Sequence, residues 1–205
     1  MILETILSSI STDGIVNFAP MGLHISDTDL ERSPVKRIVF RLYSGSQTYE
    51  NLKETGEGVI NFTDDVLVFV ETALYSACPR SVPSQKVRPS SMAHASTIWE
   101  FTVTRFDPST DPAFLEGKIE HREQRSGFAG FCRAQGAVLE AAIAATRWQW
   151  LPIGKIINSW PVWLEVVQKT GGNREREAFN KVGSFLVDKG IQVPIVSGDG
   201  RKASL

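Results

Sequence analysis

The pair Asp13-Gly14 is the sequence feature that most constrains the fold of this chain. Asp-Gly accepts the positive φ angles of a tight turn, so between two alternating runs it is a strong hairpin signal. The run at residues 3–9 precedes the pair, and a second run follows it from about residue 16. We therefore expect the chain to begin with an antiparallel β-hairpin.

The second strand of this hairpin contains unusual residues for a strand interior. Pro20 donates no ladder hydrogen bond, so the strand must bend there or have a free edge. Gly22 removes a side chain close by, which would let a flat ligand approach the backbone. Two interpretations follow: an edge strand with a proline bend, or the seat of a planar ring. The hexapeptide 17–22 alone favours the first.

The next segments predict a phosphate site. Residues 37–43 form a strand with Ile38, Phe40 and Leu42 on one face. A short helix follows, with Ser46 as N-cap and Gly56 at C′, and residues 57–63 resume as a strand. Hydroxyls and amides gathered at a helix N-terminus favour an anion. A binding site for a planar ring and a binding site for a phosphate on neighbouring strands suggest a flat, phosphorylated cofactor.

Three motifs in this region resemble one known family. Residues 17–22 (NFAPMG), 46–51 (SQTYEN) and 55–61 (TGEGVIN) are similar in order and spacing to motifs of the flavin reductase-like FMN-binding split barrels. The closest resemblance is to a branch of uncharacterised FMN-binding proteins with a helical C-terminal extension. The motifs cover about residues 1–65, and strand pattern extends the likeness to about residue 123.

The resemblance implies FMN as cofactor, a homodimer with FMN at the subunit interface, and a set of contacts. These candidate cofactor-binding residues are Asn17, Ala19, Pro20, Met21, Gly22, Arg41, Ser44, Ser46, Gln47, Thr48 and Asn51. Where the family has Lys-Asp, this chain has Ser46-Gln47, so neutral groups would bind the phosphate. Any positive charge would come from Arg41, Arg122, Arg125 or Arg133. No catalytic acid or base is expected.

Composition excludes other classes of function. With 22 basic and 23 acidic side chains among 205 residues, the chain has no electrostatic case for nucleic acid or a membrane surface. It has no apolar run long enough to span a bilayer and no signal-peptide pattern. Two cysteines make no disulfide framework, and three histidines show no metal spacing. We expect a cytoplasmic protein without a metal.

The remaining front part contains two ambiguous segments. Residues 65–74 fit a strand or a helix, and Asp64 as a possible N-cap favours helix. Residues 97–104 and 113–122 alternate as strands. Between these elements, residues 76–96 are rich in Ser and Pro, and their prolines argue against regular structure. This segment is either a lid over the cofactor or a solvent-exposed loop. If it is a lid, its candidate polar contacts to the cofactor are Arg80, Lys86, Arg88 and His94.

The back part of the chain has helical patterns. The turn at residues 125–131 either binds an anion or reverses the chain, and reversal is favoured. A helix over about 133–147 has an alanine-rich face, typical of close packing. Another helix is expected to start at Asn158 or Ser159 with Pro161 in its first turn. The last runs from Asn173 as N-cap to Gly190 as C′, and the tail at 197–205 is expected to fray.

These observations predict a mainly β fold with an α extension. A six-stranded antiparallel split barrel would occupy residues 1–123, and a helical subdomain residues 124–196. The resemblance implies an oxidoreductase that passes electrons from a nicotinamide nucleotide through FMN. The alternative is a non-catalytic FMN-binding protein acting as carrier, sensor or partner subunit, and a third is a structural protein without a cofactor. The sequence does not indicate the electron acceptor or the choice between NADH and NADPH.

Overall fold

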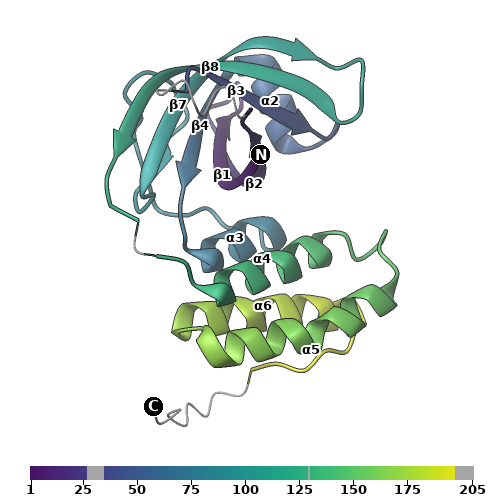
Figure 1. Ribbon diagram of the computed structural model, residues 1–205. Helices are drawn as coiled ribbons and strands as arrows, with labels where there is room; N and C mark the ends of the chain where they lie inside the picture. Colours follow the sequence, from purple (N-terminus) through teal and green to yellow (C-terminus); the bar gives the residue numbers. More distant parts are fainter. Residues whose placement is uncertain (27–34, 129, 197–205) are drawn as a thin grey trace. The chain divides into compact units, whose positions relative to one another are not determined.

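A computed structural model describes residues 1–26, 35–128 and 130–196 (Figure 1). Contacts divide the chain into two compact units, which we describe separately. The first contains the described parts of 1–64 and 76–128, and the second those of 65–75 and 130–196. The boundary expected at residue 123 stays a prediction, and the tail at 197–205 lies outside the described residues.

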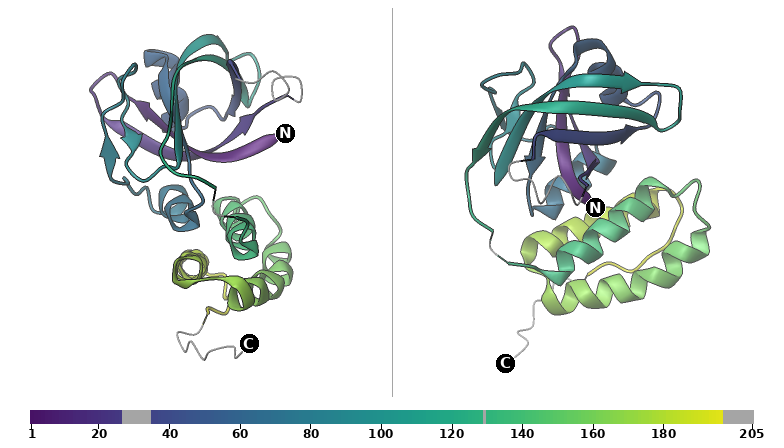
Figure 2. Two further views of the ribbon diagram at one scale, coloured as in Figure 1. Left: turned by 60° about the vertical axis from the view of Figure 1, so that its left-hand side comes forward. Right: turned by 45° about the horizontal axis from the view of Figure 1, so that its top comes forward.

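The first unit is a closed barrel of six antiparallel strands, as predicted (Figures 1 and 2). Around the barrel the strands follow in the order β1 (Ile2–Ile10), β2 (Val16–His24), β3 (Arg37–Leu42), β8 (Ala113–Gln124), β7 (Thr97–Asp107) and β4 (Glu57–Phe62), which pairs back to β1. The hairpin prediction is confirmed, because β1 and β2 pair from Ile2–His24 to Ile10–Val16. Gly14 has a φ of 84° in the connecting turn.

The barrel wall is weakest between β2 and β3. These strands pair only at His24 and Val39, so residues 16–23 of β2 have no ladder partner on this side among the described residues. We call this stretch the seam. Pro20 lies within it, which agrees with the expectation of a free edge around the proline.

The barrel interior is apolar. Ile38, Phe40 and Leu42 are fully buried on one face of β3, as their alternation predicted. Helix α2 (Gln47–Thr55) adds Tyr49 and Leu52 to the same core. Its predicted caps are confirmed: Ser46 Oγ accepts a hydrogen bond from the Tyr49 amide (3.2 Å), and Gly56 has a φ of 67°.

Gly58 is required by close approach within this core. A Cβ at this position would lie 2.5 Å from Phe101 Cζ and 3.3 Å from Leu52 Cδ2. The glycine of the 55–61 motif therefore lets an aromatic ring and helix α2 pack directly on the β4 backbone.

The proline-rich segment 76–96 has more order than its composition suggested. Two short strands, β5 (Ser81–Val82) and β6 (Ser91–Met92), pair within it, so the expectation of no regular structure was wrong. The prolines lie just outside the paired residues, where they remove no ladder donor. The segment before it forms helix α3 (Val66–Leu74), as predicted, but its N-cap is Asp65 and not Asp64.

The second unit packs α3 with α4 (Arg133–Thr146), α5 (Ile153–Thr170) and α6 (Asn173–Asp188) (Figure 2). The alanine-rich face of α4 is buried as predicted. The expected start of α5 at Asn158 or Ser159 was wrong: the helix begins at Ile153, five or six residues before these positions, and carries Pro161 in its interior. Ile156 and Trp160 continue the buried stripe through this region, so tertiary packing outweighs the lost hydrogen bond.

The N-cap of the last helix lies one residue before the expected position, and Asn173 is the first helical residue. Gly172 is the cap, and its amide donates to the Glu175 carboxylate at 2.9 Å. The expected C′ glycine is confirmed, since Gly190 has a φ of 83°. Phe179, Val182 and Leu186 form the predicted buried face.

Candidate functional site

A polar network lies where α2 meets the β1–β2 hairpin. Asn17 on β2 donates from Nδ2 to Thr48 Oγ1 at 3.0 Å. Asn51 donates to Ser9 Oγ at 3.0 Å and accepts from Gln47 Nε2 at 2.7 Å. Thr48 and Asn51 are 2% and 1% exposed. Four residues from two separate motifs are therefore brought together, and their role toward a cofactor stays a prediction.

The N-terminus of α2 presents donors beside this network. In the first turn, the amides of Gln47 and Thr48 have no carbonyl one turn earlier within the helix to bind. The positive end of the helix dipole adds to their preference for an anion. Ser46 contributes less than expected, because its hydroxyl is used in the cap and also donates to the Tyr43 carbonyl at 3.0 Å. The Ser44 amide donates to Asp111 Oδ1 at 3.2 Å.

The seam supplies a second set of backbone groups. In an antiparallel pair, alternate residues point their peptide groups away from the partner strand. On β2 these groups face the side where β3 does not pair. From Asn17 to Gly22 the strand covers five residue steps, about 17 Å. The seam thus forms a strip of peptide donors and acceptors that starts next to α2.

Two of the β2 residues predicted to bind the cofactor, Met21 and Gly22, already contact strand β1. The Met21 carbonyl accepts a hydrogen bond from Thr5 Oγ1 at 2.8 Å. A Cβ at Gly22 would lie 2.8 Å from Ile2 Cγ2. The glycine therefore admits the Ile2 side chain of the neighbouring strand. Ala19 and Pro20 are partly exposed on the seam.

Of the four arginines considered for the phosphate, Arg41 lies nearest to α2 along the chain. It precedes the end of β3 by one residue, and its guanidinium lies 5.0 Å from the Phe114 ring. Arg122 is nine residues along β8 from Ala113, the partner of Leu42, so about 30 Å of strand separates it from this end. Arg133 begins α4 in the second unit.

Arg125 is already engaged in the barrel. Its guanidinium donates to the Met92 carbonyl, Ser91 Oγ and Glu123 Oε2 at 2.7, 3.1 and 3.0 Å. These bonds hold the end of β8 to strand β6. Arg125 is therefore accounted for as a structural residue.

The 76–96 segment is fastened to the barrel. Glu100 of β7 is fully buried and accepts hydrogen bonds from the amides of residues 85, 86 and 87 at 2.9, 2.6 and 3.2 Å. Asn61 Oδ1 accepts from the Met92 amide at 2.7 Å, and Arg88 Nε donates to Glu57 Oε2 at 2.9 Å. These hydrogen bonds hold the segment against strands β4 and β7. A role as a lid over the cofactor stays a prediction.

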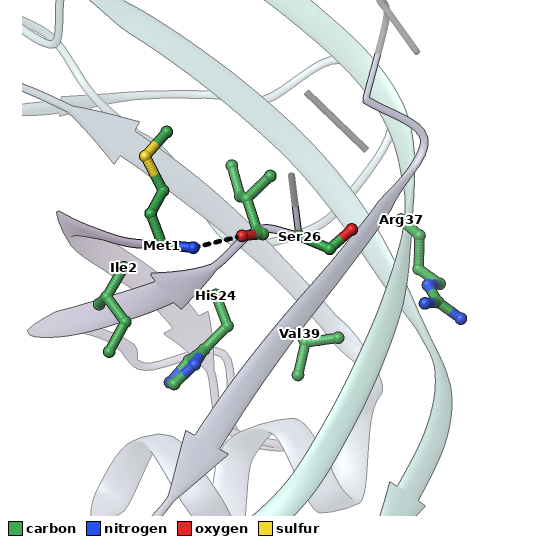
Figure 3. Close-up of a pocket in the computed structure, with 7 residues that line it drawn as sticks. Met1, Ile2, His24, Ser26, Arg37 and Val39 are labelled. Atoms are coloured by element: carbon green, nitrogen blue, oxygen red, sulfur yellow. Dashed lines mark hydrogen bonds between the residues drawn. The ribbon is translucent and has the colours of Figure 1, made fainter. Parts of the chain in front are cut away.

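A shallow cavity of about 330 Å³ lies at the other end of the seam (Figure 3). Ile2, His24, Arg37 and Val39 line it, and the terminal ammonium of Met1 donates to the Ile25 carbonyl beside it at 2.7 Å. Burial, with help from Arg41 and the terminal ammonium, lowers the pKa of His24 below its usual value. This end of the seam therefore favours neutral histidine near neutral pH.

Two contributors to the site were missed in the sequence. Ser9 binds Asn51, and Asp111 binds the turn before α2. Ser9 had a usable signal, because Ser8 and Ser9 interrupt the apolar run of β1 shortly before the hairpin turn. Asp111 had none, since it lies in a Pro-rich connection far along the chain.

Two further properties follow from the described ranges. No cluster of three or more His, Cys, Asp or Glu side chains within them could hold a metal ion. No helix in these same ranges combines the length and the apolar character needed to cross a membrane.

The fold and the polar seam define a split-barrel protein with a helical extension. The sequence matches the family described as protein of unknown function (DUF447), with its N-terminal domain at residues 3–126 and its second domain at 132–184. The chain belongs to the DUF447 family. A comparison with curated proteins gave no match.

Two solved structures illustrate the similarity. An FMN-bound protein of the same family from Methanosarcina mazei has 22% sequence identity and a TM-score of 0.76, over 90% of this chain and 95% of its own. Nitrilotriacetate monooxygenase component B from Bacillus cereus has 18% identity and a TM-score of 0.50, over 66% and 78%. At these identities the likeness concerns the fold.

Proposed function

We propose that this protein binds FMN and acts as a flavin reductase-like oxidoreductase that takes electrons from a nicotinamide nucleotide. The observation that carries the proposal is the juxtaposition of the α2 N-terminus with the seam through the Asn17–Thr48 hydrogen bond. The FMN bound by the Methanosarcina mazei relative supports the same cofactor.

The residues present fit this cofactor. The phosphate would bind at the amides of Gln47 and Thr48, with Thr48 Oγ1 and Ser44 beside them. Arg41 is the candidate for a balancing charge. The flavin ring would lie along Ala19, Pro20 and Met21, where the free peptide groups can pair with the alternating donors and acceptors of its pyrimidine edge. Gly22 would contribute through its backbone.

The chain offers one phosphate seat and no G-x-G-x-x-G turn for a pyrophosphate, which favours FMN over FAD. When bound, FMN would supply the redox chemistry, and the protein would orient it and hydrogen-bond its ring. No acid or base beside the seam is needed for this role, and we assign no catalytic residue.

A spectroscopic experiment tests the function. The ligand released by heat from the purified protein, or taken up on reconstitution, should have the mass of FMN. Addition of NADH or NADPH without oxygen should then bleach the flavin absorbance. Bound FMN that neither nucleotide reduces would instead indicate the non-catalytic alternative of a carrier, sensor or partner subunit. Isolation with FAD, or failure to take up any flavin, would contradict the cofactor.

We also propose that the protein is a homodimer. The seam lines a cofactor with one strand and one helix end, and a second wall is needed to exclude water from the ring. A second copy is the source that the family resemblance favours. Sedimentation velocity of the FMN-loaded protein at micromolar concentration should give the mass of a dimer. A monomer that retains its FMN would show that the chain closes its own site.

A further inference from the structure

Arg122 is a partly buried cation, and two of its donor atoms have no hydrogen-bond or ion-pair partner among the described residues. Its Nε and Nη2 atoms are inaccessible to solvent and make no hydrogen bond. Its guanidinium lies 4.9 Å from the Trp99 ring centroid on the facing strand β7. Leaving charged donors buried without an acceptor is costly, so such a group in a folded protein calls for an explanation.

The two unpaired atoms form one recognition surface. The N–H bonds of Nε and Nη2 point in parallel from the same edge of the guanidinium, which matches the two oxygens of a carboxylate. This chain uses the same edge elsewhere, because Arg174 binds both oxygens of Asp65 through Nε and Nη2. Arg122 therefore presents the Nε and Nη2 edge of its guanidinium with no acceptor bound to it among the described residues.

The neighbouring carboxylates on β7 and β8 are engaged with other groups. Glu100 binds loop amides, Glu123 binds Arg125, and Glu120 binds Thr102 and Lys118. Burial alone lowers the pKa of Arg122, with no contribution from a nearby charge. A singly charged anion would thus be balanced here, whereas a phosphate dianion would keep an excess charge.

The ring beside the guanidinium belongs to an aromatic pair. Trp99 packs edge-to-face on Phe62 with ring centroids 4.7 Å apart, and Ile60 is the direct neighbour of Trp99 on β4. Trp99 and Phe62 are both partly exposed, so a small molecule can reach their edges. This combination suits an acid with an apolar body.

We propose that Arg122, Trp99 and Phe62 form a binding site for a small apolar monocarboxylate. Arg122 is remote from the proposed phosphate site, because about 30 Å of strand lies between it and the α2 end of β8. The inference does not depend on FMN binding.

Titration with benzoate tests the site, with tryptophan fluorescence and thermal shift as readouts. Wild-type protein should bind benzoate saturably, and Arg122→Gln should weaken binding at least tenfold. Arg122→Lys keeps the charge but lacks the parallel edge, so it should weaken binding to a similar extent. The matched control is Arg105→Gln, an exposed arginine of β7 paired with Asp107, which should bind benzoate like the wild type.

Several results would overturn the proposal. These are a benzoate response no larger than that of chloride at equal ionic strength, unchanged binding in Arg122→Gln, or preference for inorganic phosphate. If the variants do not fold, the Nε–H signal of Arg122 in wild-type NMR spectra decides, because benzoate should shift it. Thr48→Val should leave benzoate binding intact, so this proposal and the flavin proposal can fail separately.

Discussion

Glu100→Ala should lower the free energy of unfolding of the barrel by about 3–5 kcal/mol, since each hydrogen bond to a charged group contributes roughly 1.5–3 kcal/mol and the cost of burying the carboxylate offsets part of their sum. The fully buried carboxylate accepts three amides from residues 85–87. Alanine leaves these donors without their acceptor and opens a cavity beneath them. Urea unfolding followed by tryptophan fluorescence measures the loss, and hydrogen exchange should show it locally at residues 85–87.

Two variants make this result specific to the buried carboxylate. Glu100→Gln can keep its oxygen on the amides of residues 86 and 87 but places its NH2 group against the amide of residue 85, so its effect should be intermediate. Glu120→Ala removes an exposed carboxylate from the same strand pair, where Thr102 and Lys118 lower its pKa through hydrogen bonds. Its unfolding midpoint should stay at the wild-type value. Equal midpoints for Glu100→Ala and Glu120→Ala would show that the segment is not held by Glu100.

Thr48→Val should weaken FMN binding about 10- to 100-fold, because a hydrogen bond to a charged phosphate contributes roughly 1.5–3 kcal/mol. The Thr48 hydroxyl accepts the Asn17 amide, and no acceptor for its own hydrogen is found among the described residues. That hydrogen can therefore be donated to a phosphate at the helix end. Valine keeps the shape of the side chain and removes only this polar group. Fluorescence titration of the apo variant with FMN gives the dissociation constant.

Thr55→Val is the matched control at the other end of the same helix. Its hydroxyl donates to the Asn51 carbonyl at 2.8 Å, away from the helix N-terminus. FMN affinity should remain near that of the wild type in this variant. If Thr48→Val binds FMN as tightly as Thr55→Val does, Thr48 does not contact the phosphate.

Local signals in the sequence predicted most of the barrel. The Asp13-Gly14 turn, the Ser46 and Gly56 caps and the alternation in β3 act over a few residues, so they can be recognised without the fold. Predictions failed where distant contacts decide. Pro161 lies within α5 because its neighbours are buried by other helices, and the 81–92 strands are held by Glu100 and Asn61 from the barrel wall.

The candidate site, too, could be predicted only in part from the sequence. The motif residues Asn17, Thr48 and Asn51 do lie together, and their roles toward FMN remain a prediction. The choice among four arginines could not be made from the sequence, because strand register sets the distance of each from α2. Asp111 was missed for the same reason, as it contacts Ser44 across a separation of 67 residues.

Within the described ranges, the stretch of β2 that β3 leaves unpaired also has a consequence for self-association. Unpaired strand edges invite accidental strand addition and aggregation, and proteins commonly protect them with proline. Pro20 lies in the middle of the seam and cannot donate to an added strand. A single residue thus interrupts the ladder that another chain would need, while the peptide groups around it stay available to a compact ligand. The edge can remain open in a crowded cell without becoming a template for misassembly.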